Sequence, residues 1–157
     1  MSINLDTEKK LQQFFSEIEY QTIIDLNIDY LKEAISLKLI SVNNDELTKI
    51  NITFHQVMSY YVYQEPEYDT YRLNNFDEES NLLLTESSYF PQGFGKIMIE
   101  SLNSELKEIE TLSSATNFYF QVNNKDYFFI EANSLSINGI EYRNLITDDK
   151  ELKKPLD

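Results

Sequence analysis

The sequence of 157 residues contains no cysteine and no tryptophan, one histidine, three glycines and three prolines. Without cysteine the chain can form no disulfide, no thiolate metal site and no cysteine nucleophile. Its single histidine, His55, cannot supply the two or three histidines of a typical catalytic zinc site. The scarcity of glycine and proline argues against a linker or a collagen-like chain. The absence of cysteine fits a reducing compartment, and we expect a cytoplasmic protein.

Long apolar runs are also missing from the chain. No run approaches the roughly 18 apolar residues that a transmembrane helix needs. The N-terminal segment has no apolar stretch after a basic start, so it does not resemble a secretory signal. The formal net charge is −14, whereas nucleic acids and anionic membranes are bound by positive surfaces. We therefore expect neither nucleic acid nor membrane as a partner. The few glycines form no phosphate-binding loop, and we expect no cofactor.

Aromatic side chains are abundant instead, with eleven tyrosines and ten phenylalanines. Both residue types favour pleated, half-buried surfaces, which indicates a protein rich in β-strands. The length is natural for one globular domain, which we place at residues 1–146. The charged tail, residues 147–157, is expected to fray.

The spacing of apolar residues predicts one helix followed by strands. Between residues 5 and 18 they recur every three or four positions, which indicates an amphipathic helix. A switch of phase at Ile40 and Val42 suggests a bulge, and Asn138-Gly139 suits a type I′ hairpin turn. An alternation of apolar and polar residues predicts strands at 24–30, 35–42, 50–64, 94–100, 117–122, 127–132 and 134–142. Helical spacing of apolar residues predicts a short helix at 102–115. The predicted fold is mostly β (α+β), an antiparallel β-sandwich or a strongly curled sheet with an N-terminal helix.

The most unusual segment is an acidic loop, residues 65–86, with seven acids and one base. Long irregular connections are uncommon in compact domains, so its length points to a function or to disorder. Acidic side chains steer a basic partner, and interleaved aromatic side chains supply buried anchors. The candidate partner-binding residues are Glu65, Glu67, Tyr68, Asp69, Tyr71, Phe76, Asp77, Glu78 and Glu79. The alternatives are that the rings pin the loop onto the domain, or that the acids are merely solvated. Calcium could bind such oxygens, but we expect no metal.

Catalytic constellations are weak in this sequence. His55 lies in the segment FHQV without a glycine-rich nucleophile elbow, so we interpret it as a structural strand residue. Glu100 and Glu131 could form the carboxylate pair of a glycosidase, but they alternate with apolar residues as solvated strand positions do. No nucleophile is visibly paired with a base, and we expect no enzyme.

Three segments carry a resemblance to a known family: FHQVMSYYVYQ at 54–64, GFGKIMIE at 93–100, and NFYFQVNNKDYFFIEANSLSING at 117–139. In their order and pattern they resemble the small YxiG-like proteins of Bacillus and relatives. The resemblance covers most of the chain and rests on apolar alternation, so it offers no active-site residue to carry over. Genes of similar proteins often lie near polymorphic toxin genes, which implies an immunity or accessory role.

Two hypotheses of function follow from these patterns. The first is an acidic, non-enzymatic protein-interaction domain, in one form an immunity-type protein that binds a basic partner such as a toxin domain. The alternative is a small-molecule or carbohydrate-binding β module that uses an aromatic sheet face. Tyr119, Tyr127 and Phe129 would line that face.

Overall fold

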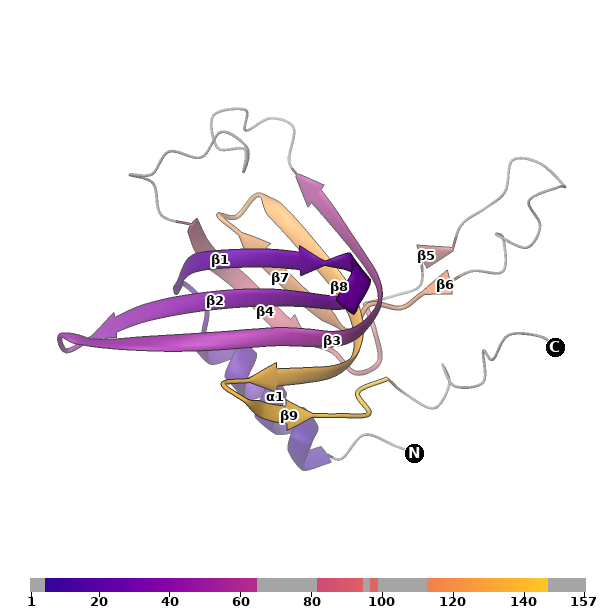
Figure 1. Cartoon of the computed structure of the whole chain (residues 1–157), viewed down its shortest axis with the longest axis horizontal. Helices are drawn as coiled ribbons and strands as arrows, with labels where there is room; N and C mark the ends of the chain where they lie inside the picture. The colour runs from indigo at the N-terminus through magenta and orange to yellow at the C-terminus, as the bar shows by residue number, and fades with distance from the viewer. Residues whose placement is uncertain (1–4, 65–81, 95–96, 99–112, 147–157) are drawn as a thin grey trace, which may run out of the picture.

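The computed structural model describes residues 5–64, 82–94, 97–98 and 113–146. Most of these residues belong to antiparallel strands, and one helix precedes the strands (Figure 1). The elements in chain order are α1 (Leu5–Glu17), β1 (Thr22–Asp29), the 3-10 helix η1 (Tyr30–Lys32), β2 (Ala34–Asn43), β3 (Glu46–Gln64), β4 (Leu82–Tyr89), β5 (Ile97–Met98), β6 (Ser113–Ser114), β7 (Phe118–Val122), β8 (Asp126–Ile137) and β9 (Ile140–Tyr142).

The sheet curls until it closes on itself. Its strand order is β3-β2-β1-β4-β7-β8-β9, and β3 pairs with β8 as well. This double pairing is possible because β3 is 19 residues long: residues 46–54 pair with β2, and residues 52–64 pair with β8. Strands β5 and β6 form a separate two-stranded pair. The prediction of a strongly curled antiparallel sheet with an N-terminal helix is therefore confirmed.

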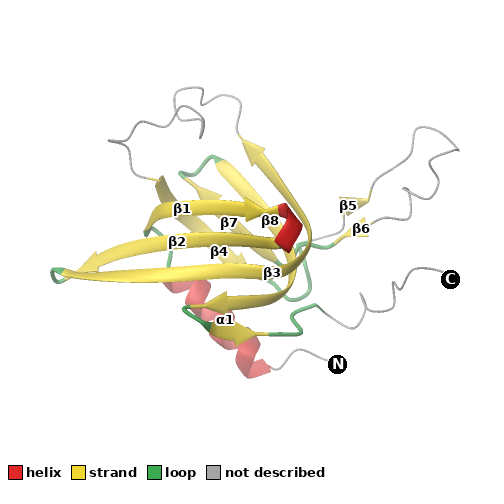
Figure 2. Ribbon diagram, viewed as in Figure 1, coloured by secondary structure: helices red, strands yellow, loops and turns green. Residues whose placement is uncertain are grey.

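The hydrophobic core lies inside the curl. Directly paired residues share a face of the sheet, and the rows across β2, β3 and β8 bring buried aliphatic and aromatic side chains together. Helix α1, red in Figure 2, packs on β4. Its Phe15 ring lies 5.7 Å from the ring of Phe118, and the Phe15 carbonyl accepts a hydrogen bond from Ser87 Oγ at 2.6 Å. The apolar stripe of the predicted helix thus completes the core.

Bulges are where the sequence prediction and the structure differ. The register between β1 and β2 shifts between Ile23 and Asp25, so Ile23 enters the core and Ile24 is exposed. The predicted bulge near Ile40 is wrong, because β2 pairs with β3 without a shift. A bulge occurs instead in β3, between Val57 and Ser59.

Three other predictions differ from the structure or are only partly covered by it. The segment 82–86, predicted to be part of the acidic loop, belongs to strand β4. The predicted helix at 102–115 falls largely outside the described residues, and within its last three positions Ser113–Ser114 form β6. Of the strand predicted at 94–100, the structure describes residues 94 and 97–98, and Ile97–Met98 form β5.

Candidate functional site

The candidate residues of the acidic loop lie outside the described part of the chain. All nine of them fall within residues 65–81: Glu65, Glu67, Tyr68, Asp69, Tyr71, Phe76, Asp77, Glu78 and Glu79. Their role as a partner-binding set stays a prediction. Glu86, the last acid of that acidic stretch, is an exposed residue of β4.

The aromatic residues of the alternative hypothesis do meet on one face. Strands β7 and β8 pair Tyr119 with Phe129, and their ring centroids lie 5.0 Å apart. The ring of Tyr127, two residues earlier on β8, lies 6.4 Å from that of Tyr119. Their strand neighbours Phe118, Phe120, Phe128 and Ile130 are buried in the core. Because side chains alternate along a strand, the three predicted rings lie on the outer face of the sheet.

Four more rings extend this group. Tyr61 of β3 stacks on Phe129 at 4.6 Å, and Tyr63 lies 6.1 Å from Tyr127. Phe94 lies 6.0 Å from Tyr119 and 6.2 Å from Phe129, and Phe90 joins through Phe94 at 5.6 Å. We call the resulting set the outer aromatic face: Tyr61, Tyr63, Phe90, Phe94, Tyr119, Tyr127 and Phe129. The predicted aromatic face did not include these four rings, because they lie on segments distant in sequence from β7 and β8. Tyr63 among them is 52% exposed.

Acidic groups lie beside these rings. The Tyr119 hydroxyl donates a hydrogen bond to Glu86 Oε2 at 3.5 Å. Burial raises the pKa of Tyr119 well above its usual range, and the charge of Glu86 adds to the rise. Glu131, one of the two carboxylates considered for a glycosidase, is buried and accepts hydrogen bonds from Ser59 Oγ at 3.2 Å and from the Ala115 amide at 3.0 Å. It is therefore a structural acid rather than a solvated one, and Glu100 lies outside the described residues.

His55 also lies on the outer side of the sheet. Its Nε2 is 3.2 Å from Ser136 Oγ of β8. In a catalytic triad an acid orients the imidazole from its other nitrogen, and within the described residues no such acid contacts Nδ1. The contact is a polar cross-strand pair, as the sequence interpretation of His55 expects.

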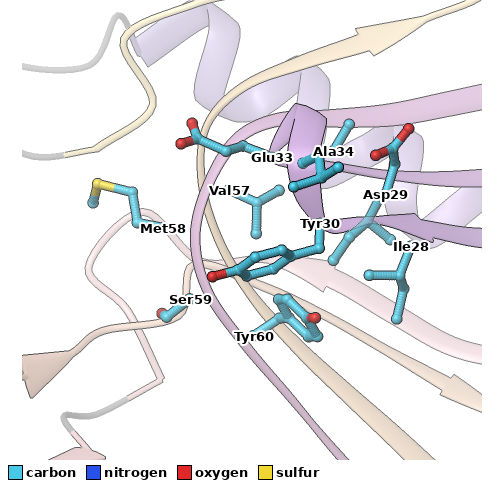
Figure 3. Close-up of a pocket in the computed structure, with 11 residues that line it drawn as sticks. Ile28, Asp29, Tyr30, Glu33, Ala34, Val57, Met58, Ser59 and Tyr60 are labelled. Carbon is cyan, nitrogen blue, oxygen red and sulfur yellow. The ribbon is translucent and has the colours of Figure 1, made fainter.

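A hollow of about 760 Å³ opens on the inner side of β3, where η1 faces the bulge (Figure 3). No sequence pattern indicates this hollow, because the two segments that line it are far apart in the chain. Apolar side chains form most of the lining. The lining residues are Ile28, Asp29, Tyr30, Leu31, Glu33, Ala34, Ile35, Val57, Met58, Ser59 and Tyr60.

Backbone contacts hold the two sides of the hollow in place. The Asp29 carboxylate accepts a hydrogen bond from the Lys32 amide at 3.2 Å and so caps η1. Glu33 ends η1 in the left-handed conformation with φ 53°, and its carbonyl accepts from the Val57 amide at 2.9 Å. Gln56, next to Val57, also has a positive φ of 50°. Such bulges redirect side chains, so the irregular backbone on both sides sets the shape of the hollow.

Comparison with protein families identifies the family of this chain. The model of the YxiG-like protein family matches residues 11–142. The chain therefore belongs to the YxiG-like family, as the resemblance of its strand segments suggested. No curated protein matches the sequence. Among the described residues, none of the helices has the length and apolar character required to cross a bilayer.

Proposed function

We propose that this protein is a non-enzymatic, acidic protein-interaction domain that binds a basic protein partner through its outer aromatic face. The observation that carries the proposal is the continuous group of seven rings, of which Tyr63, Phe90 and Phe94 are between 39% and 52% exposed. Exposed apolar groups that gather in one patch mark interaction sites, whereas scattered ones do not.

Physical reasons favour a protein as the partner. Tyrosine and phenylalanine bury large areas with few rotatable bonds, so they are the usual anchors of protein interfaces. The rings lie on the outer side of a curled sheet, and none of them lines the hollow beside η1. Such an outer surface suits a broad partner. The net charge of −14 would steer a partner of opposite charge and speed association. An immunity-type protein that blocks a basic toxin domain is one form of this role.

The test is recovery of a partner from the native host with matched variants. The double variant Tyr63→Ser/Phe90→Ser removes two exposed rings, and Tyr20→Ser removes an exposed ring away from the face. We expect the wild type and Tyr20→Ser to recover the same basic protein at low salt. Recovery should fail at about 0.5 M salt, where charges more than a few ångströms apart are screened, and it should fail for the double variant at either salt. Equal recovery by the double variant would remove the face from the proposal.

One observation favours the alternative function, the binding of a carbohydrate or small molecule. Tyr61 and Phe129 stack almost in parallel, at 11°, and Tyr119 and Tyr127 at 22°, so the rings form an ordered aromatic surface on which a ligand could pack. A ligand that stacks on these rings would shift the amide resonances of β7 and β8 in titrations with oligosaccharides, and the same double variant would reduce the shifts. Partner capture without such shifts favours the protein.

A further inference from the structure

The apolar lining of the hollow is open to solvent. Leu31 is 90% exposed, Tyr30 78% and Tyr60 39%. Tyr60 pairs with the buried Ile130, so it lies on the inner side of β3, and it is exposed because β2 no longer accompanies β3 beyond Phe54. Apolar groups that line a concavity rather than a bulging surface indicate a site for a bound molecule.

The volume and the lining define the size of this molecule. About 760 Å³ lies within the range of roughly 300–1,000 Å³ that small-molecule sites have. The deeper wall is apolar, since Ile35 is buried and Val57 half-buried. In Figure 3 the Tyr30 ring extends across the hollow toward Ser59, and the Tyr60 ring lies next to it. An apolar body would be held between these side chains.

The charged residues of the lining indicate which head group the bound molecule would carry. The lining contains the carboxylates of Asp29 and Glu33 and no lysine or arginine. The Asp29 carboxylate already has partners in η1, because it accepts a hydrogen bond from the Lys32 amide and its Oδ2 lies 4.0 Å from Lys32 Nζ. Within the described residues the Glu33 carboxylate has no hydrogen bond or ion pair. Glu33 is therefore the acid that remains for a ligand, and a cation is the group it would attract.

The backbone of Glu33 supports a role for its side chain. A residue with a Cβ atom in the left-handed region costs about 1–2 kcal/mol relative to a right-handed one, and glycine avoids this cost. At Glu33 this conformation ends η1, with the Glu33 amide donating to the Tyr30 carbonyl and the Glu33 carbonyl accepting from the Val57 amide. Strained positions of this kind gather at functional sites.

We propose that the hollow binds an amphipathic organic cation, a small molecule with an ammonium group and an apolar body. The ammonium group lies against the Glu33 carboxylate, and the Tyr30 ring borders the same hollow with a face that attracts cations. The apolar body packs on Ile35, Val57 and Tyr60. This site is distinct from the outer aromatic face, and it does not depend on the function proposed above.

Three probes that share one apolar body test the proposal on the full chain. Phenylbutylammonium, phenylbutanol and phenylbutanoate differ only in head group, and binding is followed by the amide resonances of the protein. We expect phenylbutylammonium to give saturable shifts confined to residues 28–35 and 57–60. Its Kd should be at least about tenfold lower than that of phenylbutanoate, with phenylbutanol between them, because the carboxylate of Glu33 repels an anion.

Matched variants then test whether the Glu33 carboxylate attracts the ammonium group. Glu33→Gln should weaken the binding of phenylbutylammonium by about fivefold, the effect of losing one partly exposed charge contact. The affinity for phenylbutanol should stay unchanged. Glu46→Gln, an exposed acid at the start of β3, should change neither. Equal affinities of the ammonium and the carboxylate probes, shifts located outside the hollow, the lack of saturable shifts, or equal behaviour of the two variants would each overturn the proposal.

Discussion

Removing the Lys125 amino group should destabilise the fold more than any single exposed substitution. Lys125 Nζ lies 2.7 Å from Asp126 Oδ2, and the two side chains are 3% and 0% exposed. Among the described residues Asp126 Oδ1 has no hydrogen-bond partner, so the carboxylate relies on this lysine for compensation. Breaking a buried pair by removing one partner costs about 3–5 kcal/mol. We expect Lys125→Met to lower the free energy of unfolding by about 4 kcal/mol, a large share of the roughly 5–15 kcal/mol typical of a domain.

The assay is urea unfolding of Lys125→Met and of the double variant Lys125→Met/Asp126→Leu, with thermal unfolding in parallel. A loss of about 4 kcal/mol corresponds to a Tm lower by about 10 °C for a chain of this size. The double variant should recover most of the loss, because well-packed apolar side chains often replace a buried pair without cost. A loss below about 1 kcal/mol for Lys125→Met would refute the reasoning, since it would mean that the pair is solvated.

Two further predictions concern buried polar groups near the ends of strands. The Tyr89 hydroxyl is buried and has no hydrogen-bond partner in the part of the chain that the structure describes. Tyr89→Phe should therefore leave the free energy of unfolding unchanged or raise it by about 1 kcal/mol at neutral pH. Burial, and to a lesser extent the charge of Glu8, raises the pKa of Tyr89. The free energy of unfolding should therefore fall as the pH rises above about 10, where the tyrosine ionises in the unfolded chain but not in the folded one. Urea unfolding at increasing pH should show a smaller fall for Tyr89→Phe. The Asn117 side chain donates to the carbonyls of Ala132 at 3.0 Å and Leu145 at 3.2 Å and accepts from the Ala132 amide at 3.0 Å. Asn117→Ala should cost about 2–4 kcal/mol in urea unfolding and speed hydrogen exchange at the Ala132 amide; unchanged exchange there would contradict the assigned contacts.

The parts of the fold that local sequence determines could be predicted. Apolar alternation placed Ile35, Leu37 and Leu39 of β2 on one face, and all three are buried in the core. Asn138 and Gly139 have positive φ angles of 50° and 86°, as the predicted type I′ turn requires. Periodicity and turn residues act over a few positions, so they are visible without knowledge of the strand partners.

The bulges could not be predicted, because they depend on register between strands. The sequence near Ile24 alternates regularly, yet the pairing with β2 shifts between Ile23 and Asp25. Near Ile40 and Val42 the opposite occurs: the apolar pattern changes phase, but the pairing with β3 stays continuous. Val42 is simply an exposed apolar residue near the hairpin turn. A phase switch in one strand therefore does not determine a bulge, since the partner strand can accommodate it.

The candidate sites depend even more on distant contacts. Tyr61 and Phe129 stack because β3 pairs with β8, although 68 residues separate them in the sequence. The three rings on β7 and β8 could be predicted to lie together, because these two strands form one hairpin. The hollow combines η1 with the bulge of β3, and no local pattern relates Tyr30 to Tyr60.

Both surfaces arise from one property of β3, its change of partner from β2 to β8. Beyond Phe54, β3 pairs with β8 and with no other described strand, and both of its faces carry exposed side chains. Tyr60 lines the hollow on the inner face, whereas Tyr61 stacks on Phe129 on the outer face. Adjacent tyrosines of a single strand therefore belong to different proposed sites. Tyr60→Ser should impair only the binding of the organic cation, and Tyr61→Ser only the capture of a protein partner. A variant that impaired both would mean that the two surfaces form one site, and separate effects would establish them as independent.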